Sequence, residues 1–345
     1  MSCKHIFRSI LLIVISGVLL FSCNEEKSKT NNGELSEAAS GDSIESIEQI
    51  SEQIRKNPEN APLFQKRAKL WIFQGNIAEA QNDISIALKL DSLKPEYYFD
   101  QAEFFIMKGE SGKAKNSIEK CLSFFPDNTE ALVKLSEIYM YVKNYKESLT
   151  ILKKVEELDP NIAYTYFIKG IIYKETGDTV NAIDNLLITV NKEPEFYNAY
   201  VLLGMLSSDL GDTLAIDFYK TAIRIIPNSI EAHYNLGLFY QQNSRYLAAI
   251  DMYKKIINEI DSTYFPAYYN IAYIQLQHFK EYREALDYFN KALSLNPEYV
   301  ETIYNIGLCY ELLKDYDKAR SFYNKALEKE TNYDLAIQGL NRLDD

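Results

Sequence analysis

The stretch YNLGLFY, residues Tyr234–Tyr240, decides the fold because the chain repeats it at a fixed interval. The chain reads YNIAYIQ from Tyr269 and YNIGLCY from Tyr304, so the interval is 35 residues both times. Prolines mark nearly the same period over a longer part of the chain. They lie at Pro58, Pro126, Pro160, Pro194, Pro227 and Pro297, with separations of 68, 34, 34, 33 and 70 residues. A period of this length is typical of stacked supersecondary units.

Alignment on this period gives eight repeats over residues 61–331, and three columns of the alignment are regular. The first column holds only small residues: Ala68, Ala102, Ser136, Gly170, Gly204, Gly237, Ala272 and Gly307. The second is also small: Ala80, Ala114, Ser148, Ala182, Ala215, Ala249, Ala285 and Ala319. The third is bulky: Ile84, Ile118, Leu152, Leu186, Tyr219, Tyr253, Phe289 and Tyr323.

The spacing within a repeat predicts two helices. Bulky, small and aromatic residues follow one another four and then three positions apart, as in Tyr166, Gly170 and Tyr173, which places them on one face of a helix. Glycines such as Gly75 and Gly177 are expected to end the first helix, and the proline to stop the second. Each repeat is therefore a helical hairpin that must stack on its neighbour to bury its apolar face.

This pattern resembles the tetratricopeptide repeat, whose consensus is met by HYNLGLFY (233–240) and AAIDMYKKII (248–257). The resemblance implies an all-α fold, a right-handed α-solenoid of about eight hairpins over residues 61–331. Some positions depart from the consensus. Arg67, Gln101 and Lys169 replace the usual Leu before the first small residue, Ser207 and Gln275 replace the second aromatic, and repeats five to seven contain one-residue gaps.

Both ends of the repeat array are predicted to carry a capping helix. Residues 44–60 contain an apolar stripe of Ile44, Ile47, Ile50 and Ile54 after polar residues suited to start a helix. Residues 332–345 contain Leu335, Ala336, Leu340 and Leu343 separated by polar residues. A terminal helix needs this arrangement because its outer side faces water.

The first 43 residues predict export and lipid attachment. Residues 1–22 combine Lys4 and Arg8 with the apolar run from Ile10 to Phe21, which is too short to span a bilayer as a permanent helix. They resemble a bacterial lipoprotein signal that is removed before Cys23, so the resemblance implies an acylated Cys23 that binds the lipid bilayer; a plain secretory signal is the alternative. Residues 23–43 are polar and predict a flexible tether. The implied location is the cell envelope, at the outer membrane, on its periplasmic side or at the cell surface.

Composition and motifs exclude several functions. The chain has 49 Asp and Glu against 37 Lys and Arg, so no basic surface is available for nucleic acid. Three histidines and four cysteines without metal-ligand spacing indicate no metal site, and no cofactor is implied. GESGKAK (109–115) lacks the first glycine of a phosphate-binding loop. Because insertions between repeats are single residues, no part of the chain remains for a catalytic domain, and the protein is predicted not to be an enzyme.

The resemblance also places a binding groove on the first helices, at their second, fifth, ninth and twelfth positions. The ninth position changes from Lys69, Glu103 and Glu137 to apolar residues in repeats four to eight. The predicted partner-binding residues are Tyr164, Phe167, Ile171, Val201, Met205, Tyr234, Leu238, Tyr269, Tyr273, Tyr304 and Leu308. The groove lacks the Lys and Asn clamp of family members that hold a C-terminal carboxylate. Ordinary packing of the fifth-position residues is the alternative interpretation.

These features predict a membrane-anchored scaffold that binds proteins or peptides in the groove and organises an assembly of the cell envelope. A glycan-binding surface lipoprotein of a nutrient-uptake system is the alternative, because sugars can stack on aromatic side chains. The relatives that bind glycans carry long insertions around the sugar site, and this chain has none, which favours protein binding.

Overall fold

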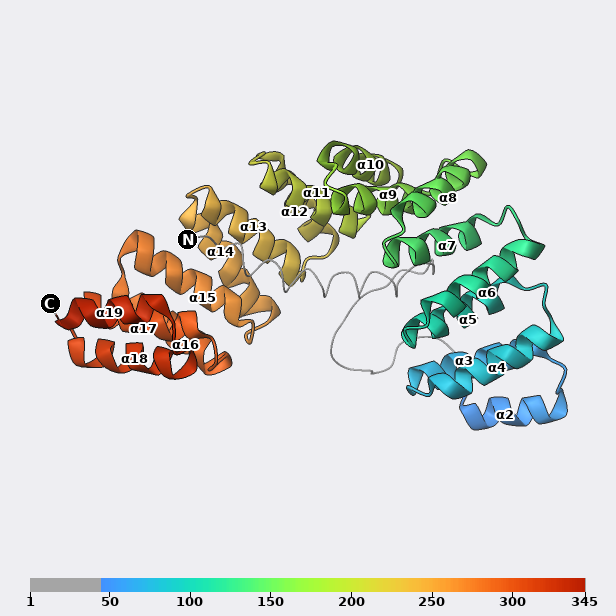
Figure 1. Cartoon of the computed structure of the whole chain (residues 1–345), viewed down its shortest axis with the longest axis horizontal. Coiled ribbons are helices and arrows are strands. Elements are labelled where there is room, and N and C mark those ends of the chain that lie inside the picture. The colour runs from blue at the N-terminus through green and yellow to red at the C-terminus, as the bar shows by residue number, and fades with distance from the viewer. Residues whose placement is uncertain (1–44, 345) are drawn as a thin grey trace. The chain divides into compact units, whose positions relative to one another are not determined.

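The computed structural model describes residues 45–344 (Figure 1). The predicted signal segment, Cys23 and the tether lie outside the described residues. The described part contains eighteen α-helices and two π-helical turns, and no strand. The fold is therefore all-α, as the repeat pattern predicts.

Sixteen α-helices form eight hairpins, each made of a first and a second helix (Figure 1). The first helices are α3 (Ala61–Phe73), α5 (Pro95–Met107), α7 (Thr129–Tyr141), α9 (Ala163–Glu175), α11 (Tyr197–Asp209), α13 (Ile230–Gln242), α15 (Phe265–Ile274) and α17 (Val300–Leu312). The second helices are α4 (Ile77–Leu90), α6 (Ser111–Phe124), α8 (Tyr145–Leu158), α10 (Thr179–Lys192), α12 (Leu214–Ile225), α14 (Tyr246–Lys255), α16 (Tyr282–Leu295) and α18 (Tyr316–Lys329).

The chain divides into two compact units. The N-terminal unit extends to Ile168 and the C-terminal unit begins at Lys169. In each unit the two helices of a hairpin pack against each other, and a second helix packs against the first helix of the next hairpin, as α6 does on α7 and α12 on α13. First helices of successive hairpins also touch, as in α5 with α7 and α11 with α13. Each unit is therefore a stack of hairpins with its first helices on one side.

The hairpin turns share one backbone conformation. Gly75, Gly109, Gly177 and Gly211 have φ between 70° and 82° and follow the first helix, as predicted. The other four turns use Lys143, Ser244, Lys280 and Lys314, with φ between 58° and 64°. The left-handed conformation closes the helix end with local hydrogen bonds. It is unfavourable for a residue with a Cβ atom, so these four turns rely on the packing of the helices on either side.

The small columns lie where the paired helices approach most closely. All sixteen small residues are buried. At Gly204 and Gly237 a Cβ atom would lie 2.6 Å from Tyr219 Cε1 and Tyr253 Cε1, respectively. Ala68 and Ala102 stand in the same column of repeats whose bulky residues are isoleucines, Ile84 and Ile118. The tyrosines of repeats five, six and eight therefore pair with glycines, whereas Phe289 of repeat seven packs with Ala272 and Leu186 of repeat four lies against Gly170.

The single-residue insertions in repeats six and seven and the deletion in repeat five are accommodated by changes in the helices. The extra residue of repeat six falls between Ala249 and Ser262, where the π-helical turn η2 (Ile256–Ile260) continues α14. The extra residue of repeat seven falls between Ala272 and Ala285, where η3 (Gln275–Phe279) continues α15. Repeat five lacks one residue before Ala215, and its second helix is the short α12 of 12 residues. A π-turn takes up an insertion without moving the residues on either side out of register.

Short helices lie at both ends of the described chain. Helix α2 (Ile47–Lys56) begins with a capping box between Ser46 and Gln49, and it buries Ile47, Ile50 and Ile54. It packs on α3. Helix α19 (Asp334–Asp344) packs on α18 and α17. Its Gly339 is so close to Tyr323 that a Cβ atom would lie 2.6 Å from the ring.

Candidate functional site

The residue at the ninth position of the first helix differs in character between the two units. In the C-terminal unit all five are apolar and partly exposed, and we call this set the apolar stripe: Ile171, Met205, Leu238, Tyr273 and Leu308. In the N-terminal unit the same position holds Lys69 and Glu103, which are exposed, and Glu137, which is buried. A row of apolar side chains on the C-terminal unit is thus available for contact, whereas the N-terminal unit presents charge.

The fifth residues of the first helices lie deeper. Phe167, Val201 and Tyr304 have exposed fractions of 1%, 3% and 9%. Tyr234 and Tyr269 are partly exposed, and their rings pack on other rings. Tyr269 lies 5.3 Å from Tyr299 and 5.6 Å from Phe289, measured between ring centroids. The fifth-position residues therefore act as packing groups beneath the apolar stripe, and a direct contact with a partner stays a prediction for them.

The repeated YN dipeptide links one repeat to the next. Asn270 Nδ2 donates to the hydroxyl of Tyr234 at 3.1 Å, and Asn305 Nδ2 donates to the hydroxyl of Tyr269 at 3.2 Å. Each asparagine is the sixth residue of its helix and reaches the fifth residue of the preceding first helix. Burial raises the pKa of the Tyr269 hydroxyl, which therefore stays protonated. These links fix the spacing of the helices that carry the apolar stripe.

The N-terminal unit makes the same link with other chemistry. Gln65, a fifth residue, donates from Nε2 to Oδ2 of Asp100, the next sixth residue, at 2.6 Å. The ammonium of Lys134 lies 5.4 Å from the ring centroid of Phe99, again joining a sixth residue to a fifth. The positions in contact are thus set by the hairpin geometry, while the residues at them differ between the units.

Three carboxyl groups on the first helices of the N-terminal unit are harder to ionise than usual. Desolvation by neighbouring side chains raises the pKa values of Asp100 and Glu137, and also that of Glu103 although this residue is exposed. The Tyr164 hydroxyl donates to Glu137 Oε1 at 2.5 Å and opposes this rise. Tyr164, one of the predicted groove residues, therefore binds a carboxylate of its own chain. Together with Phe167 it belongs to the N-terminal unit.

Arg67 and Gln101, both at the seventh position, pair with polar residues sixteen positions later in the chain. Arg67 makes two hydrogen bonds of 2.7 Å with the carboxylate of Asp83, whose side chain is 2% exposed. Gln101 Oε1 accepts from the hydroxyl of Ser117 at 2.8 Å. Sequence reasoning missed these pairs, although the sixteen-residue spacing was available as a signal. The polar residues are matched inside the hairpin and are not defects of the repeat.

The last helix closes the aromatic row of the C-terminal unit. Arg342 donates to both carboxylate oxygens of Glu311 at 2.8 Å, and the Tyr323 hydroxyl donates to the same carboxylate. Tyr323 stacks on Tyr304 with 5.6 Å between ring centroids. Burial acts to raise the pKa of Glu311, but the bonds from Arg342 and Tyr323 outweigh it and the net shift is downward. Helix α19, through Arg342, thus supplies a cationic partner for Glu311 of the last first helix.

Other groups singled out in the sequence have packing roles. His233 is 3% exposed, with Nδ1 2.8 Å from the carbonyl oxygen of Ser229. In GESGKAK, Gly109 forms the hairpin turn and Ala114 is buried. Cys121 and Cys309 are buried free thiols, and burial raises their pKa values to about 11 and about 12. Such thiols are poor nucleophiles at neutral pH.

Residues 45–344 contain neither a metal-binding cluster nor a helix that could span a membrane. This part of the chain has no group of three or more His, Cys, Asp or Glu side chains that could hold a metal ion. None of its helices combines the length and the apolar character needed to cross a bilayer.

Comparison with known families agrees with the hairpin geometry. Models described as "Tetratricopeptide repeat" match residues 129–162, 230–259 and 264–329, and a model described as "TPR repeat" matches residues 213–244. The chain is a tetratricopeptide repeat protein. Stacked repeats of this kind bind other proteins along extended surfaces, so the family supports a protein-binding or peptide-binding scaffold as the general class.

Individual relatives of the repeat protein are distant. The human protein O-mannosyl-transferase TMTC3 is 25% identical over 236 residues, which cover 65% of this chain and 25% of that protein. The BBSome complex member BBS4 of Bos taurus is 22% identical over 270 residues, which cover 78% of this chain and 45% of that protein. The chain therefore spans less than half the length of these two relatives. The crystal structure of MamA protein is 28% identical and covers 49% of this chain and 94% of its own, with a TM-score of 0.43.

Proposed function

We propose that this protein is a membrane-anchored scaffold that binds a protein or peptide segment along the apolar stripe of its C-terminal unit and organises an assembly of the cell envelope. The observation that carries the proposal is the stripe itself: five consecutive repeats present one partly exposed apolar side chain each, at the same helical position. A row of evenly spaced apolar groups matches the apolar face of a partner's helix or extended segment.

The packing beneath the stripe supports this function. The tyrosine and asparagine links hold α13, α15 and α17 at a fixed spacing, so a partner meets a surface that is already ordered. A preformed surface reduces the entropy lost on binding. The tyrosines of the same helices favour a protein over a glycan, because Tyr269 and Tyr304 already pack against other rings and do not offer a free face for a sugar.

A double variant tests the binding surface. Replacing Tyr273 and Leu308 together by Ala removes two neighbouring members of the stripe, and partners recovered by cross-linking in the native envelope should be lost. Leu214→Ala is the control, because Leu214 is 51% exposed and lies on a second helix. Retention of every partner at full affinity by the double variant would reject the stripe as the site.

The anchor is proposed from Cys23 and the signal-like segment before it. Cys23→Ser should abolish labelling with radioactive palmitate and release the protein from the membrane fraction. Cys3→Ser is the matched control, since a cysteine inside a removed signal cannot carry the lipid. A Cys23→Ser protein that still carries label and sediments with membranes contradicts the proposed anchor and leaves the binding surface untouched.

A further inference from the structure

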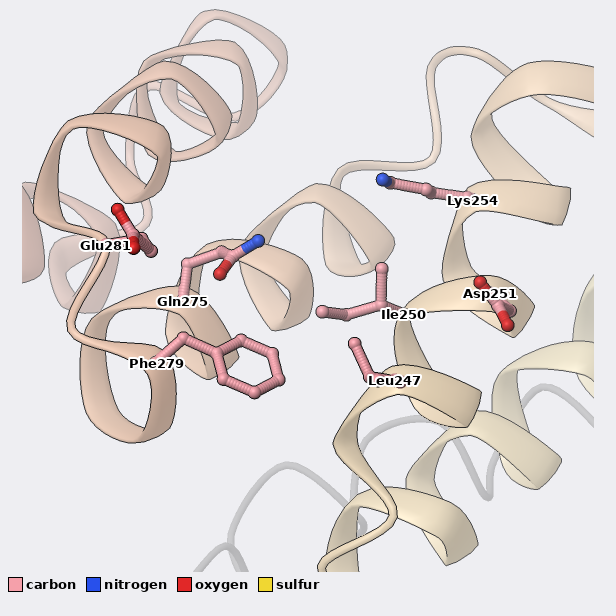
Figure 2. Close-up of a pocket in the computed structure, with 7 residues that line it drawn as sticks. All are labelled: Leu247, Ile250, Asp251, Lys254, Gln275, Phe279 and Glu281. Carbon is pink, nitrogen blue, oxygen red and sulfur yellow. The ribbon is translucent and has the colours of Figure 1, made fainter.

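A notch of about 400 Å³ lies on the C-terminal unit, between the second helix of repeat six and the end of the first helix of repeat seven (Figure 2). It is lined by Leu247, Ile250, Asp251, Lys254, Gln275, Phe279 and Glu281. None of these seven residues belongs to the apolar stripe. The notch is therefore a separate surface feature, of a size that accepts one or two large side chains.

The notch exists because of two local departures from the repeat. The eleventh residue of the first helix is aromatic in six repeats: Trp71, Phe105, Tyr139, Tyr173, Tyr240 and Tyr310. In repeat seven it is Gln275, which begins the π-turn η3. The shorter side chain leaves space that a ring would fill, and the π-turn places Phe279 at the edge of that space. A π-turn inside an α-helix often marks a functional site.

Polar groups at the notch lack partners. Gln275 is only 7% exposed, and its side-chain amide makes no hydrogen bond with any residue from 45 to 344. Lys254 forms no ion pair within the same described part, although Asp251 lies three residues before it. Figure 2 shows the Gln275 amide and the Lys254 ammonium extending toward each other across the opening. Both groups reach the opening and have no partner among the described residues, so both are available to a ligand.

The floor of the notch is apolar. Leu247 is 70% exposed and Phe279 is 37% exposed, and both lie beside the buried Ile250. Large apolar side chains with this exposure on neighbouring elements provide an anchor site for an apolar side chain. Asp251 and Glu281 lie at the two outer edges of the opening in Figure 2, whereas Lys254 points into it.

We infer that the notch binds an extended segment of a protein partner that carries a large apolar side chain next to an acidic residue. The apolar side chain lies on Leu247, Ile250 and Phe279. A peptide group of the segment pairs with the Gln275 amide, which offers one donor side and one acceptor side. The acidic side chain accepts from the Lys254 ammonium. The preference for an acidic residue is local: its side chain lies at the Lys254 ammonium, away from Asp251 and Glu281 at the outer edges of the opening.

Selection from a peptide library tests this inference. Random ten-residue segments, displayed within a carrier protein so that no chain terminus is free, are selected on the full chain. We expect enrichment of Leu, Phe or Met next to Asp or Glu. The selected sequence is then synthesised with a blocked C-terminus, and its affinity is measured by fluorescence anisotropy.

Gln275→Tyr is the decisive variant, because it restores the aromatic residue found in six of the other seven repeats and fills the notch. It should keep or raise the melting temperature and weaken the peptide at least about tenfold. Lys254→Gln should weaken it similarly, while Lys220→Gln should not. Lys220 follows Tyr219 as Lys254 follows Tyr253, and it is exposed on α12. Since Tyr273 and Leu308 lie outside the notch, their Ala variants should bind the peptide normally, which separates this test from that of the apolar stripe.

Three outcomes would overturn the inference. Enrichment of basic segments would show that the notch binds its partner through the Asp251 and Glu281 carboxylates and not through Lys254. Equal binding of the selected peptides to the Gln275→Tyr variant would place their site elsewhere. Binding that requires a free C-terminal carboxylate would show that the notch takes a chain end and not an internal acidic segment.

Discussion

The N-terminal and C-terminal units fold the same hairpin with different side chains at equivalent positions. In the N-terminal unit the seventh residues Arg67 and Gln101 pair with Asp83 and Ser117 inside the hairpin. In the C-terminal unit the corresponding residues are apolar from repeat five onward, for example Leu236. The first-helix face follows the same division, since it is charged at Lys69 and Glu103 and apolar along the stripe.

Features that recur in both units are required by the fold, whereas residue types that differ between the units are free to vary with function. The small columns and the left-handed turn recur in both units, because close helix approach depends on them. The fifth-to-sixth residue links also recur, but as an amide to a carboxylate, an ammonium on a ring, or an amide to a phenol. Geometry therefore fixes which positions meet, and the residue type at them decides which surface each unit presents.

The largest effect is expected from Arg67→Met in the N-terminal unit. It leaves the Asp83 carboxylate buried without its cation, and breaking such a pair costs about 3 to 5 kcal/mol of unfolding free energy. Urea denaturation, combined with hydrogen exchange of α3 and α4, measures the loss. Adding Asp83→Leu should recover most of the lost unfolding free energy, because the two introduced side chains would then form an apolar contact in the hairpin, where the C-terminal unit also has apolar residues at the seventh position.

The control for that variant is Lys318→Met, which removes an exposed ion pair with Asp315. It should leave the unfolding midpoint unchanged. If Arg67→Met behaves like this control, the polar hairpin core of the N-terminal unit contributes nothing, and the contrast between the units is only one of composition.

The next effect is expected from Gly237→Leu in the C-terminal unit. Even a Cβ atom at Gly237 would lie 2.6 Å from the Tyr253 ring, so a leucine must displace the ring or separate the helices, at about 1 to 3 kcal/mol. The melting temperature should fall accordingly. Gly112→Ala, where no atom lies within 4 Å of the added methyl group, should not lower it. An unchanged melting temperature for Gly237→Leu contradicts the matching of glycine with tyrosine.

Much of the fold was predictable because it depends on local and periodic signals. The small columns, the turn glycines and the prolines recur every 33 to 35 residues, so helices, turns and hairpins could be placed from them. The single-residue gaps were visible as well. Their outcome was not predictable, because an added residue can lengthen a loop or enter a helix, and only the surrounding packing selected the π-turns η2 and η3.

The candidate surfaces were less predictable than the fold. Exposure of the ninth position and burial of Phe167, Val201 and Tyr304 depend on how successive first helices approach, which a single sequence does not specify. The bond from Asn305 to Tyr269 crosses 36 residues and becomes visible only when two repeats are superposed. Gln275 could be recognised as a departure from the aromatic column, but not as a group without a hydrogen-bond partner.

A smaller effect is expected from Tyr269→Phe, which removes one link between repeats. Asn305 is 5% exposed as a residue, so its side-chain amide loses an acceptor in a place that water reaches poorly, at about 1 to 2 kcal/mol. Thermal unfolding measures the change. Tyr316→Phe, on a residue 53% exposed, is the control and should have no effect. Equal stability of both variants would mean that the tyrosine and asparagine links do not hold the first helices together.

The smallest effect concerns pH and returns to the charged face of the N-terminal unit. Burial raises the pKa of Glu137 above its ordinary value of 4.5, so the folded state binds this proton more tightly than the unfolded state. The stabilisation from the proton is fully present below pH 4.5 and is lost as the pH rises through the folded pKa. Glu137→Gln, which is neutral at every pH, should therefore be more stable than the parent at pH 7, and the difference should shrink as the pH falls toward 4.5. Comparing the two proteins at each pH cancels the similar contributions of Asp100 and Glu103. A difference that stays constant with pH would mean that Glu137 ionises as easily as an exposed carboxylate, and that the Tyr164 hydroxyl compensates its burial in full.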